Sequence, residues 1–214
     1  MSVVVERRVG LWVALSVGFV LVAGGLLGRR LDPTRRLAAA RIKRPTPFAL
    51  PEFHLVDQEG RAIDKAQLAG HVVVADFVFL QCGDTCARLT RRFRALQRQT
   101  AAQAWGSALR FVSFSVDSDD TPPTLARYRR DYGPPDGRWR LVAADERDFP
   151  RLAVGMGLAD VTSDVPNAFV ASSRYMFVID REGIVRNRYD GFSDDDAERL
   201  ARDVAALAQD GSAP

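Results

Sequence analysis

The stretch "HVVVADFVFLQCGDTCARLTRRFRAL", residues 71–96, decides the fold of this chain. Its first ten residues form a continuous apolar run rich in valine and phenylalanine, which is typical of a β-strand buried on both faces. The end of the stretch places leucine and phenylalanine on one helical stripe with arginines opposite, which predicts an amphipathic helix. Both cysteines of the chain, Cys82 and Cys86, lie where the strand passes into this helix.

The same alternation of strands and helices continues along the chain. It predicts a mixed sheet with helices on both faces, an α/β fold. A cysteine pair at the passage from the first long strand into its helix is the thioredoxin-like arrangement. The expected elements are a hairpin over 48–63, strands over 71–80, 109–117 and 174–180, a turn at 181–183 into a strand over 184–191, and helices over 86–106, 121–133, 147–158 and 193–210, with Thr121 and Ser193 as N-caps.

The N-terminal part predicts a membrane anchor. Residues 9–28 are 20 consecutive uncharged and mostly apolar positions, enough for a helix that spans the roughly 30 Å hydrocarbon core. A cleaved signal peptide usually has a shorter apolar region, and a buried core helix is the third alternative. The expected organisation is an N-terminal transmembrane helix within 1–28, a basic linker over 29–46, a folded domain over 47–210 and a frayed tail over 211–214.

The charges around the predicted anchor and the cysteine pair give opposite indications of orientation. Seven basic residues follow the span within 29–44, against Arg7 and Arg8 before it, and the positive-inside rule alone would keep the domain in the cytoplasm. A close cysteine pair instead suits a compartment where thiol chemistry takes place. We expect a single-pass protein of the bacterial inner membrane whose C-terminal domain faces the periplasm.

The overall charge of +3 belongs to the N-terminal segment. Residues 1–44 carry nine basic and two acidic groups, whereas residues 45–214 carry 21 basic and 25 acidic groups, a net charge of −4. The basic segment suits anionic lipid head groups. A nucleic-acid role requires a basic folded domain, so that class is excluded.

The cysteine pair has the features of a redox or metal-binding site. A thiol acts as nucleophile or ligand only as thiolate, and the positive end of a helix favours that anion. The sulfurs of Cys82 and Cys86 can approach within bonding distance if the loop bends, so a reversible disulfide is feasible. The structural alternative is an inert pair or a static staple, which would close too small a loop to stabilise much.

The sequence resembles the Sco/SenC family over most of residues 47–191. The resemblance is carried by "FHLVDQEGR", "VVADFVFLQCGDTC", "FVSFSVDSDDTPPTLARY" and "YMFVIDREGIVRNRYDG", with the C-x-x-x-C spacing and the "SVD…DTP…L..Y" stretch as the specific parts. Members are membrane-anchored thioredoxin-fold factors that assemble the copper A centre of cytochrome c oxidase. The resemblance implies that Cys82 and Cys86 bind copper and that the partner is the oxidase subunit carrying copper A, or another thiol protein.

Two departures from the family pattern are visible. The family usually has proline after each cysteine, where this chain has Gly83 and Ala87. The third copper ligand of the family is a histidine shortly before the last core strand, and that position falls on Ser172, or on Ala171 if the register slips by one. Neither side chain can replace imidazole, so we expect copper(I) to be held and copper(II) to bind poorly.

Other candidate ligands are expected to have ordinary structural roles. His54 and His71 precede the cysteines, and His71 should lie at the opposite end of its strand. Met176 lies within an apolar strand and should pack in the core. Asp117 has a family counterpart near the cysteines, and a strand-end cap and an electrostatic role are both open. Acidic residues 194–196 should be helix N-terminal charges, and Trp105 and Trp139 packing residues.

Three functions remain open on the sequence. The first is copper(I) delivery or thiol maintenance for an oxidase, with or without enzymatic turnover. The second is a general periplasmic thiol–disulfide oxidoreductase without metal, which the missing histidine favours. Arg174 counts against it, because thioredoxin-like reductases have a cis-proline in that register. The third is a non-catalytic interaction or sensory domain on a tether.

Overall fold

The computed structural model describes residues 47–80, 84–132, 137–143, 145, 147–156 and 174–210. The predicted anchor and linker, Cys82, Ala171 and Ser172 lie outside these residues, and the side chain of Cys86 lies outside them as well. In the part of the chain that the structure describes, no helix is long and apolar enough to cross a bilayer.

One sheet organises the described domain. The strands are arranged in the order β1-β8-β7-β4-β5-β6-β2-β3. The central strands β4, β5 and β6 are parallel, and the other neighbours pair antiparallel. The bounds are β1 Phe48–Ala49, β2 His54–Asp57, β3 Ala62–Asp64, β4 Val72–Val78, β5 Leu109–Ser115, β6 Trp139–Ala143, β7 Tyr175–Ile179 and β8 Ile184–Asp190.

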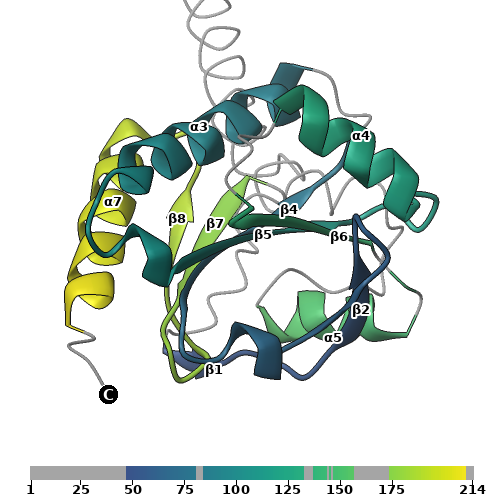
Figure 1. Ribbon diagram of the computed structural model, residues 1–214, viewed down its shortest axis with the longest axis horizontal. Helices are drawn as coiled ribbons and strands as arrows, with labels where there is room; N and C mark the ends of the chain where they lie inside the picture. Colours follow the sequence, from purple (N-terminus) through teal and green to yellow (C-terminus); the bar gives the residue numbers. More distant parts are fainter. Residues whose placement is uncertain are drawn as a thin grey trace, which may run out of the picture. The chain divides into compact units, whose positions relative to one another are not determined.

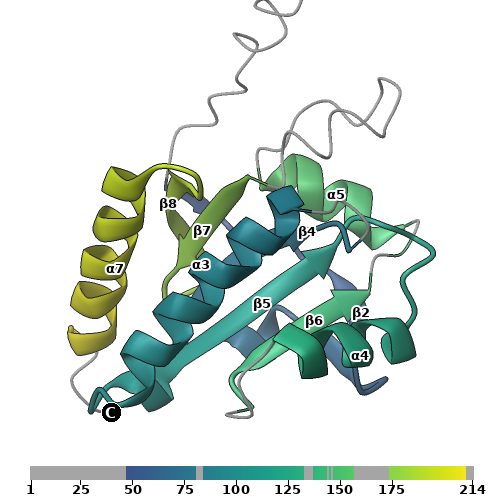
Figure 2. The same ribbon diagram turned by 90° about the horizontal axis from the view of Figure 1, so that it is seen from above.

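Helices cover both faces of this sheet (Figure 1). Three of them, α3, α4 and α7, lie on one face, and α5 lies on the other (Figures 1 and 2). Two hydrophobic clusters separate along β4, with Val72, Val74 and Val78 facing α3 and Val73, Ala75 and Phe77 facing α5. The bounds are α3 Asp84–Ala101, α4 Pro122–Tyr132, α5 Asp148–Gly155 and α7 Asp194–Gln209, with the short 3-10 turns η1 Ala66–Leu68 and η2 Gly106–Ala108.

The mixed sheet flanked by helices is confirmed, and one strand was not predicted. Strand β6 pairs in parallel with β5 and extends the sheet towards β2. Its sequence, "WRLVA", has only five residues and contains Arg140, so it gave no apolar run to detect. The α7 cap is confirmed, because the amide of Asp196 donates to Ser193 Oγ at 3.2 Å. Helix α4 begins directly after Thr121, as expected.

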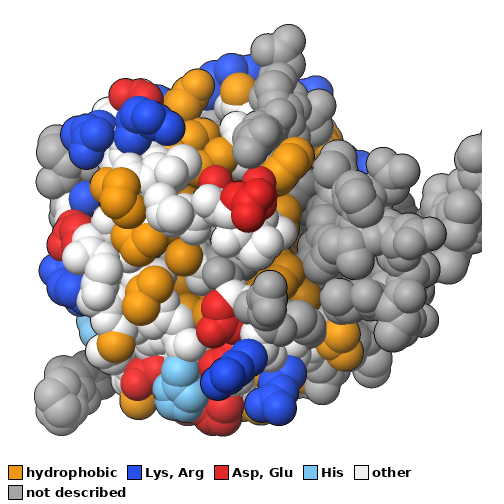
Figure 3. All heavy atoms as spheres, turned by 90° about the vertical axis from the view of Figure 1, so that its right-hand side faces the viewer, with side chains coloured by type: hydrophobic (Ala, Val, Ile, Leu, Met, Phe, Trp, Pro, Cys, Tyr) orange, Lys and Arg blue, Asp and Glu red, His pale blue; other side chains and the backbone are white. Residues whose placement is uncertain are grey.

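The side of the domain that lies to the right in Figure 1 is shown in Figure 3. Hydrophobic side chains are exposed there between separate acidic and basic groups. Two large hydrophobic residues of the described chain are well exposed, Val56 at 40% and Val154 at 53%. The described basic side chains on this side lie in separate groups (Figure 3).

Candidate functional site at the cysteine segment

The cysteine segment joins the carboxyl end of β4 to the start of α3. Strand β4 ends at Val78, α3 begins at Asp84, and Cys86 is the third residue of this helix. The amide of Val116 donates to the carbonyl oxygen of Val78 at 2.9 Å, so the parallel strands β4 and β5 end side by side. We call this edge of the sheet the thiol edge, formed by 78–80, the first turns of α3, 115–120 and the residues around Arg174. Figure 2 shows the start of α3 and the arrowheads of β5 and β6 on the same side.

This geometry confirms the strand–helix junction and leaves the thiol positions as predictions. The first turn of a helix has unpaired N–H groups and a positive dipole end. Because Cys86 belongs to that turn, its backbone position favours the thiolate form. The carboxyl ends of neighbouring parallel strands are where α/β proteins place their ligands.

A buried carboxyl group lies in β4, two residues before the strand ends. Asp76 is 2% exposed and accepts a hydrogen bond from Ser113 Oγ at 2.5 Å. Ser113 in turn accepts from Trp139 Nε1 at 2.9 Å. Burial raises the pKa of Asp76 to about 7, although the Ser113 hydrogen bond opposes the shift. Asp76 therefore gains and loses its proton near neutral pH.

Helices α3 and α4 meet above this carboxyl group. The hydroxyl oxygens of Thr90 and Tyr128 are 2.7 Å apart and join the two helices. Burial raises the pKa of Tyr128, and the nearby Asp76 carboxylate adds to the rise. Tyr128 therefore stays a neutral phenol near neutral pH.

The loop after β5 forms the acidic flank of the thiol edge. Ser115 Oγ donates to Asp120 Oδ2 at 2.6 Å, and the amide of Asp117 donates to the same hydroxyl at 3.1 Å. Asp117 also accepts from the amide of Asp119 at 3.0 Å. Burial raises the pKa of Asp120, and the carboxylates of Asp117 and Asp119 raise it further. Asp117 thus acts as a local turn residue, and its electrostatic role towards the cysteines stays a prediction.

The start of β7 forms the other flank. Met176 pairs with Asp76, so Arg174, two residues earlier, lies beside Val78. Arg174 makes a two-pronged ion pair with Asp190 at the end of β8. The predicted ligand position, Ser172, is outside the described residues. Strand β7, which follows it in the chain, begins at the thiol edge.

The predicted structural roles of the other candidates are confirmed. Met176 is 3% exposed and packs in the core beneath α3. His71 directly precedes β4, at the end away from the thiol edge. His54 opens β2, which is separated from β4 by β5 and β6. Trp139 is 1% exposed and Trp105 packs partly buried against the same core. The acidic residues 194–196 occupy the first turn of α7.

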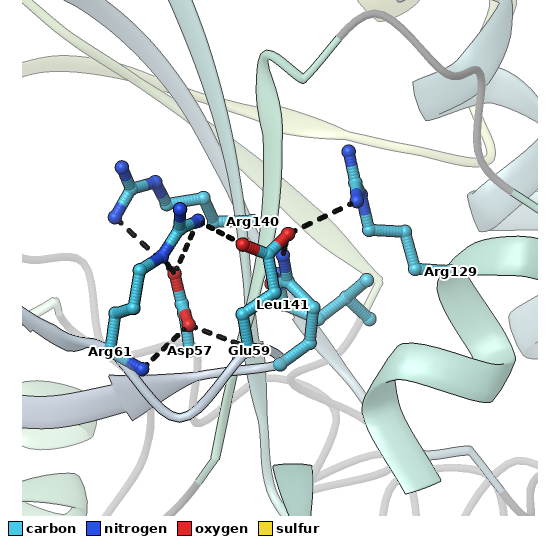
Figure 4. Close-up of polar contacts among 7 residues, drawn as sticks. Asp57, Glu59, Arg61, Arg129, Arg140 and Leu141 are labelled. Carbon is cyan, nitrogen blue, oxygen red and sulfur yellow. Dashed lines mark hydrogen bonds and ion pairs between the residues drawn. The ribbon is translucent and has the colours of Figure 1, made fainter. Parts of the chain in front are cut away.

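A contrasting carboxylate cluster lies at the turn between β2 and β3 (Figure 4). The fully buried Asp57 accepts from Arg61 Nε and Nη2 at 3.1 Å, and Arg140 Nη1 approaches at 3.4 Å. Glu59 pairs with Arg61 at 2.7 Å and with Arg129 of α4 at 3.6 Å. Both carboxylates face arginines, so the cluster fixes the hairpin turn.

Sequence reasoning missed Asp76 and the arginines of the β7 flank. An aspartate inside a strand that is buried on both faces signals a carboxyl group with a perturbed pKa. The residues around Asp76 were interpreted as one apolar run, and this signal was therefore overlooked. Arg174 meets Asp190 only through the pairing of β7 with β8, which no spacing rule reports. Among the described residues, no group of three or more His, Cys, Asp or Glu side chains could hold a metal ion.

The sheet, its helices and the position of the cysteine segment define a thioredoxin-like domain. The sequence model of SCO1/SenC matches residues 43–209. The chain is 25% identical to the SCO1 protein homolog of Bacillus subtilis over 170 residues, which covers 78% of this chain and 87% of the relative. The chain belongs to the SCO1/SenC family.

Solved structures share the fold. The structure of BsSco, described as having a disulfide switch and as a member of the Sco family of cytochrome c oxidase assembly proteins, is 23% identical with a TM-score of 0.64, covering 78% of this chain and 98% of that one. ScoI of Bradyrhizobium japonicum with copper bound is 18% identical with a TM-score of 0.58, covering 75% and 99%.

Proposed function

We propose that this chain binds copper(I) through the thiolates of Cys82 and Cys86 and serves the assembly of the copper A centre of cytochrome c oxidase. It would deliver copper or keep the thiols of the oxidase subunit reduced. The observation that carries the proposal is the placement of the whole thiol content of the chain at one strand–helix junction of a SCO1/SenC domain.

The available donors suit copper(I). It is a soft ion that accepts two thiolates with few further ligands. Copper(II) prefers nitrogen or oxygen donors in a tetragonal arrangement, and the family histidine position falls on Ser172 in this chain. Copper is the cargo in this proposal, so a site that binds copper(I) and releases it to a partner fits the role.

The same pair would also form a reversible disulfide. Mass spectrometry with thiol alkylation, before and after reduction, tests this directly because the chain has no other cysteine. A two-hydrogen difference confined to the peptide holding both residues is expected. Two thiols that stay free under mild oxidation would contradict the redox part of the proposal.

A general thiol–disulfide oxidoreductase without metal is the second candidate. Ser172, in place of the family histidine, favours it. Genetic complementation separates the two functions. Loss of the protein should lower copper A absorption in membranes, and Cys82→Ser and Cys86→Ser should each fail to restore it. Normal copper A together with accumulated misoxidised proteins would favour the second candidate.

Ser172→His should strengthen copper(II) binding by about tenfold or more, because it supplies an imidazole donor. The expected readout is a new or stronger thiolate-to-copper(II) absorption band, with Ala171→His as the register control. If the unmodified protein already shows that band at full strength, another residue supplies the ligand and this argument is wrong.

We further infer that the domain is exported and anchored by residues 9–28. The apolar length of this segment and the thiol chemistry support the inference, although the arginines after the segment oppose it. Reporter fusions placed after residue 50 test it. Activity of a cytoplasm-only reporter, with none from an export-dependent one, would contradict export.

A further inference from the structure

An aromatic ring lies between two arginines at the thiol edge. The guanidinium carbon of Arg88 is 5.3 Å from the centre of the Phe192 ring, and that of Arg174 is 5.6 Å from it. The series continues, since Arg174 lies 5.8 Å from the ring of Tyr175 and Arg188 lies 4.5 Å from it. Three arginines thus alternate with two aromatic rings, and we call the Arg88, Phe192 and Arg174 part the arginine strip.

The strip is held rigidly by the loop between β8 and α7. Asp190 accepts from Arg174 and also from the amide of Phe192, at 2.9 Å. The amide of Gly191 donates to the carbonyl oxygen of Arg174 at 2.8 Å. Arg92 of α3 donates to the carbonyl oxygen of Ser193 at 3.0 Å, which ties the loop to the helix. These contacts join three distant parts of the chain.

Close packing at Gly191 shows how tightly the loop approaches α3. A Cβ atom added at this glycine would lie 2.1 Å from Leu89 Cδ2 and 2.9 Å from the carbonyl oxygen of Arg174. The strip is therefore a built surface of defined geometry. Its position at the thiol edge follows from the backbone, because Arg88 is two residues past Cys86 on α3 and the register of β7 on β4 carries Arg174 towards Val78.

The charge of the strip is opposite to that of the domain. The alternating series contains three arginines, and Asp190 is the carboxylate that pairs with Arg174. Arg88 is exposed, and no ion pair joins it to any side chain that the structure describes. Residues 45–214 as a whole carry more acidic than basic groups. The Arg88 guanidinium, stacked over the Phe192 ring, keeps an N–H edge for a carboxylate, whereas the N–H edge of Arg174 already pairs with Asp190.

The two flanks of the thiol edge therefore differ in sign. Asp117, Asp119 and Asp120 border it on the β5 side, and the arginine strip borders it on the β7–β8 side. A charged partner would be oriented as well as attracted by such an arrangement.

We propose that the arginine strip is the docking surface for a partner protein whose own thiol or copper site is bordered by carboxylates. The inference rests on the proposed thiol or copper function and names the chemistry of the partner. Arg88 binds a carboxylate of the partner, Arg174 and Asp190 hold the Phe192 ring beneath it, and the acidic flank repels the partner's carboxylates, so the partner site is brought over the cysteine segment in one orientation.

Binding of peptides to the full chain in detergent tests the proposal independently of thiol chemistry. The protein carries Cys82→Ser and Cys86→Ser, so no exchange or copper binding contributes. The probes are two fluorescent peptides that each contain an internal disulfide. Their sequences are the same except that glutamates flank the disulfide in one peptide and glutamines flank it in the other. Fluorescence anisotropy at low salt should show at least about tenfold tighter binding of the glutamate peptide, with the preference reduced at high salt.

Matched variants assign the preference to the strip. Arg88→Gln should weaken glutamate-peptide binding by about threefold, and Arg88→Gln with Arg174→Gln by about tenfold. Arg98→Gln with Arg202→Gln removes the same charge from the far end of α3 and from α7, and should leave binding unchanged. Arg88→Gln removes the stacking contact with Phe192, so urea unfolding of this variant must match that of the parent before its binding loss is assigned to the surface charge.

Two results would overturn the docking proposal. One is equal binding of both peptides to the parent protein, and the other is an equal loss of binding in the Arg98 and Arg202 control. The proposed copper or redox function fails separately, if the cysteine-containing protein neither exchanges disulfides nor retains copper(I) while the peptide preference persists.

Discussion

Asp57 and Asp180 close the tips of two β-hairpins, whereas Asp76 and Asp120 lie at or near the thiol edge. The hairpin aspartates stand in the related sequences "DQEG" and "DREG" and form the same turn, with Gly60 and Gly183 at φ of 75° and 74°. All four carboxyl groups are largely buried, with exposures of 0, 3, 2 and 5%. The two hairpin aspartates and the two thiol-edge aspartates have different side-chain partners.

The hairpin carboxylates are compensated by cations. Asp57 pairs with Arg61 and Arg140, and Asp180 pairs with Arg186. Each also accepts two backbone amides of its own turn, at 2.8 to 3.0 Å. Buried carboxylates held in this way hold their turns together and serve the fold.

The thiol-edge carboxyl groups have only hydroxyl partners from side chains. Ser113 donates to Asp76 and Ser115 donates to Asp120. Within the described residues, no arginine or lysine forms an ion pair with either group. Burial consequently raises both pKa values. Proteins keep such costly groups at functional sites, so the comparison distinguishes the thiol edge from the hairpin end of the same sheet.

Asp76→Asn should give the largest effect. The carboxyl titrates near pH 3.8 when unfolded and near pH 7 when folded, so the folded protein holds more protons between these values and stability falls as the pH rises through that window. The amide cannot ionise and keeps an acceptor for Ser113. We expect the free energy of unfolding of the Asp76→Asn variant to exceed that of the parent by about 3 kcal/mol at about pH 8 and to equal it below about pH 4.

Urea unfolding of residues 43–214 at several pH values measures this difference. Phe77→Leu, a neighbouring core change without a titrating group, serves as the control for a pH-independent shift. A constant offset between Asp76→Asn and the parent at every pH would show that the carboxyl does not titrate as described.

Asp57→Asn should have the opposite sign. It replaces the charge facing Arg61 and Arg140 with an amide N–H₂ group that cannot accept from them. Because Arg61 is largely exposed, we expect a loss of about 2 kcal/mol at neutral pH. Thermal unfolding checks this, and Asp180→Asn should behave in the same direction. If Asp57→Asn stabilised the protein, the distinction between the hairpin aspartates and the thiol-edge aspartates would be lost.

Asp120→Asn should give the smallest effect. Burial and the neighbouring Asp117 and Asp119 raise the pKa of this group, so removing its charge stabilises the protein as the pH rises past the ordinary aspartate range. We expect the gain to be well below that of Asp76→Asn, because this loop lies closer to solvent. Urea unfolding at about pH 5 and about pH 8 would detect it, and a destabilised variant at both pH values would contradict it.

The sequence predicted the strand–helix junction, the hairpins and the capped final helix because each has a local signal. Strand β6 was missed because it is short and interrupted by Arg140. The titrating Asp76 was hidden inside an apolar run. The arginine strip joins Arg88, Arg174 and Phe192 through sheet pairing and loop packing, which no spacing in the chain reports. Tertiary contacts of this kind require the structure.

An anaerobic copper(I) titration of the full chain against a chromophoric chelator tests the central claim most directly. The account predicts that the parent protein retains about one copper(I) per chain, and that Cys82→Ser together with Cys86→Ser abolishes retention. Asp57→Asn, which changes the turn between β2 and β3 and is separated from β4 by β5 and β6, should bind as the parent does. Failure of the parent to retain copper(I), or equal retention by the serine variant, would contradict the claim.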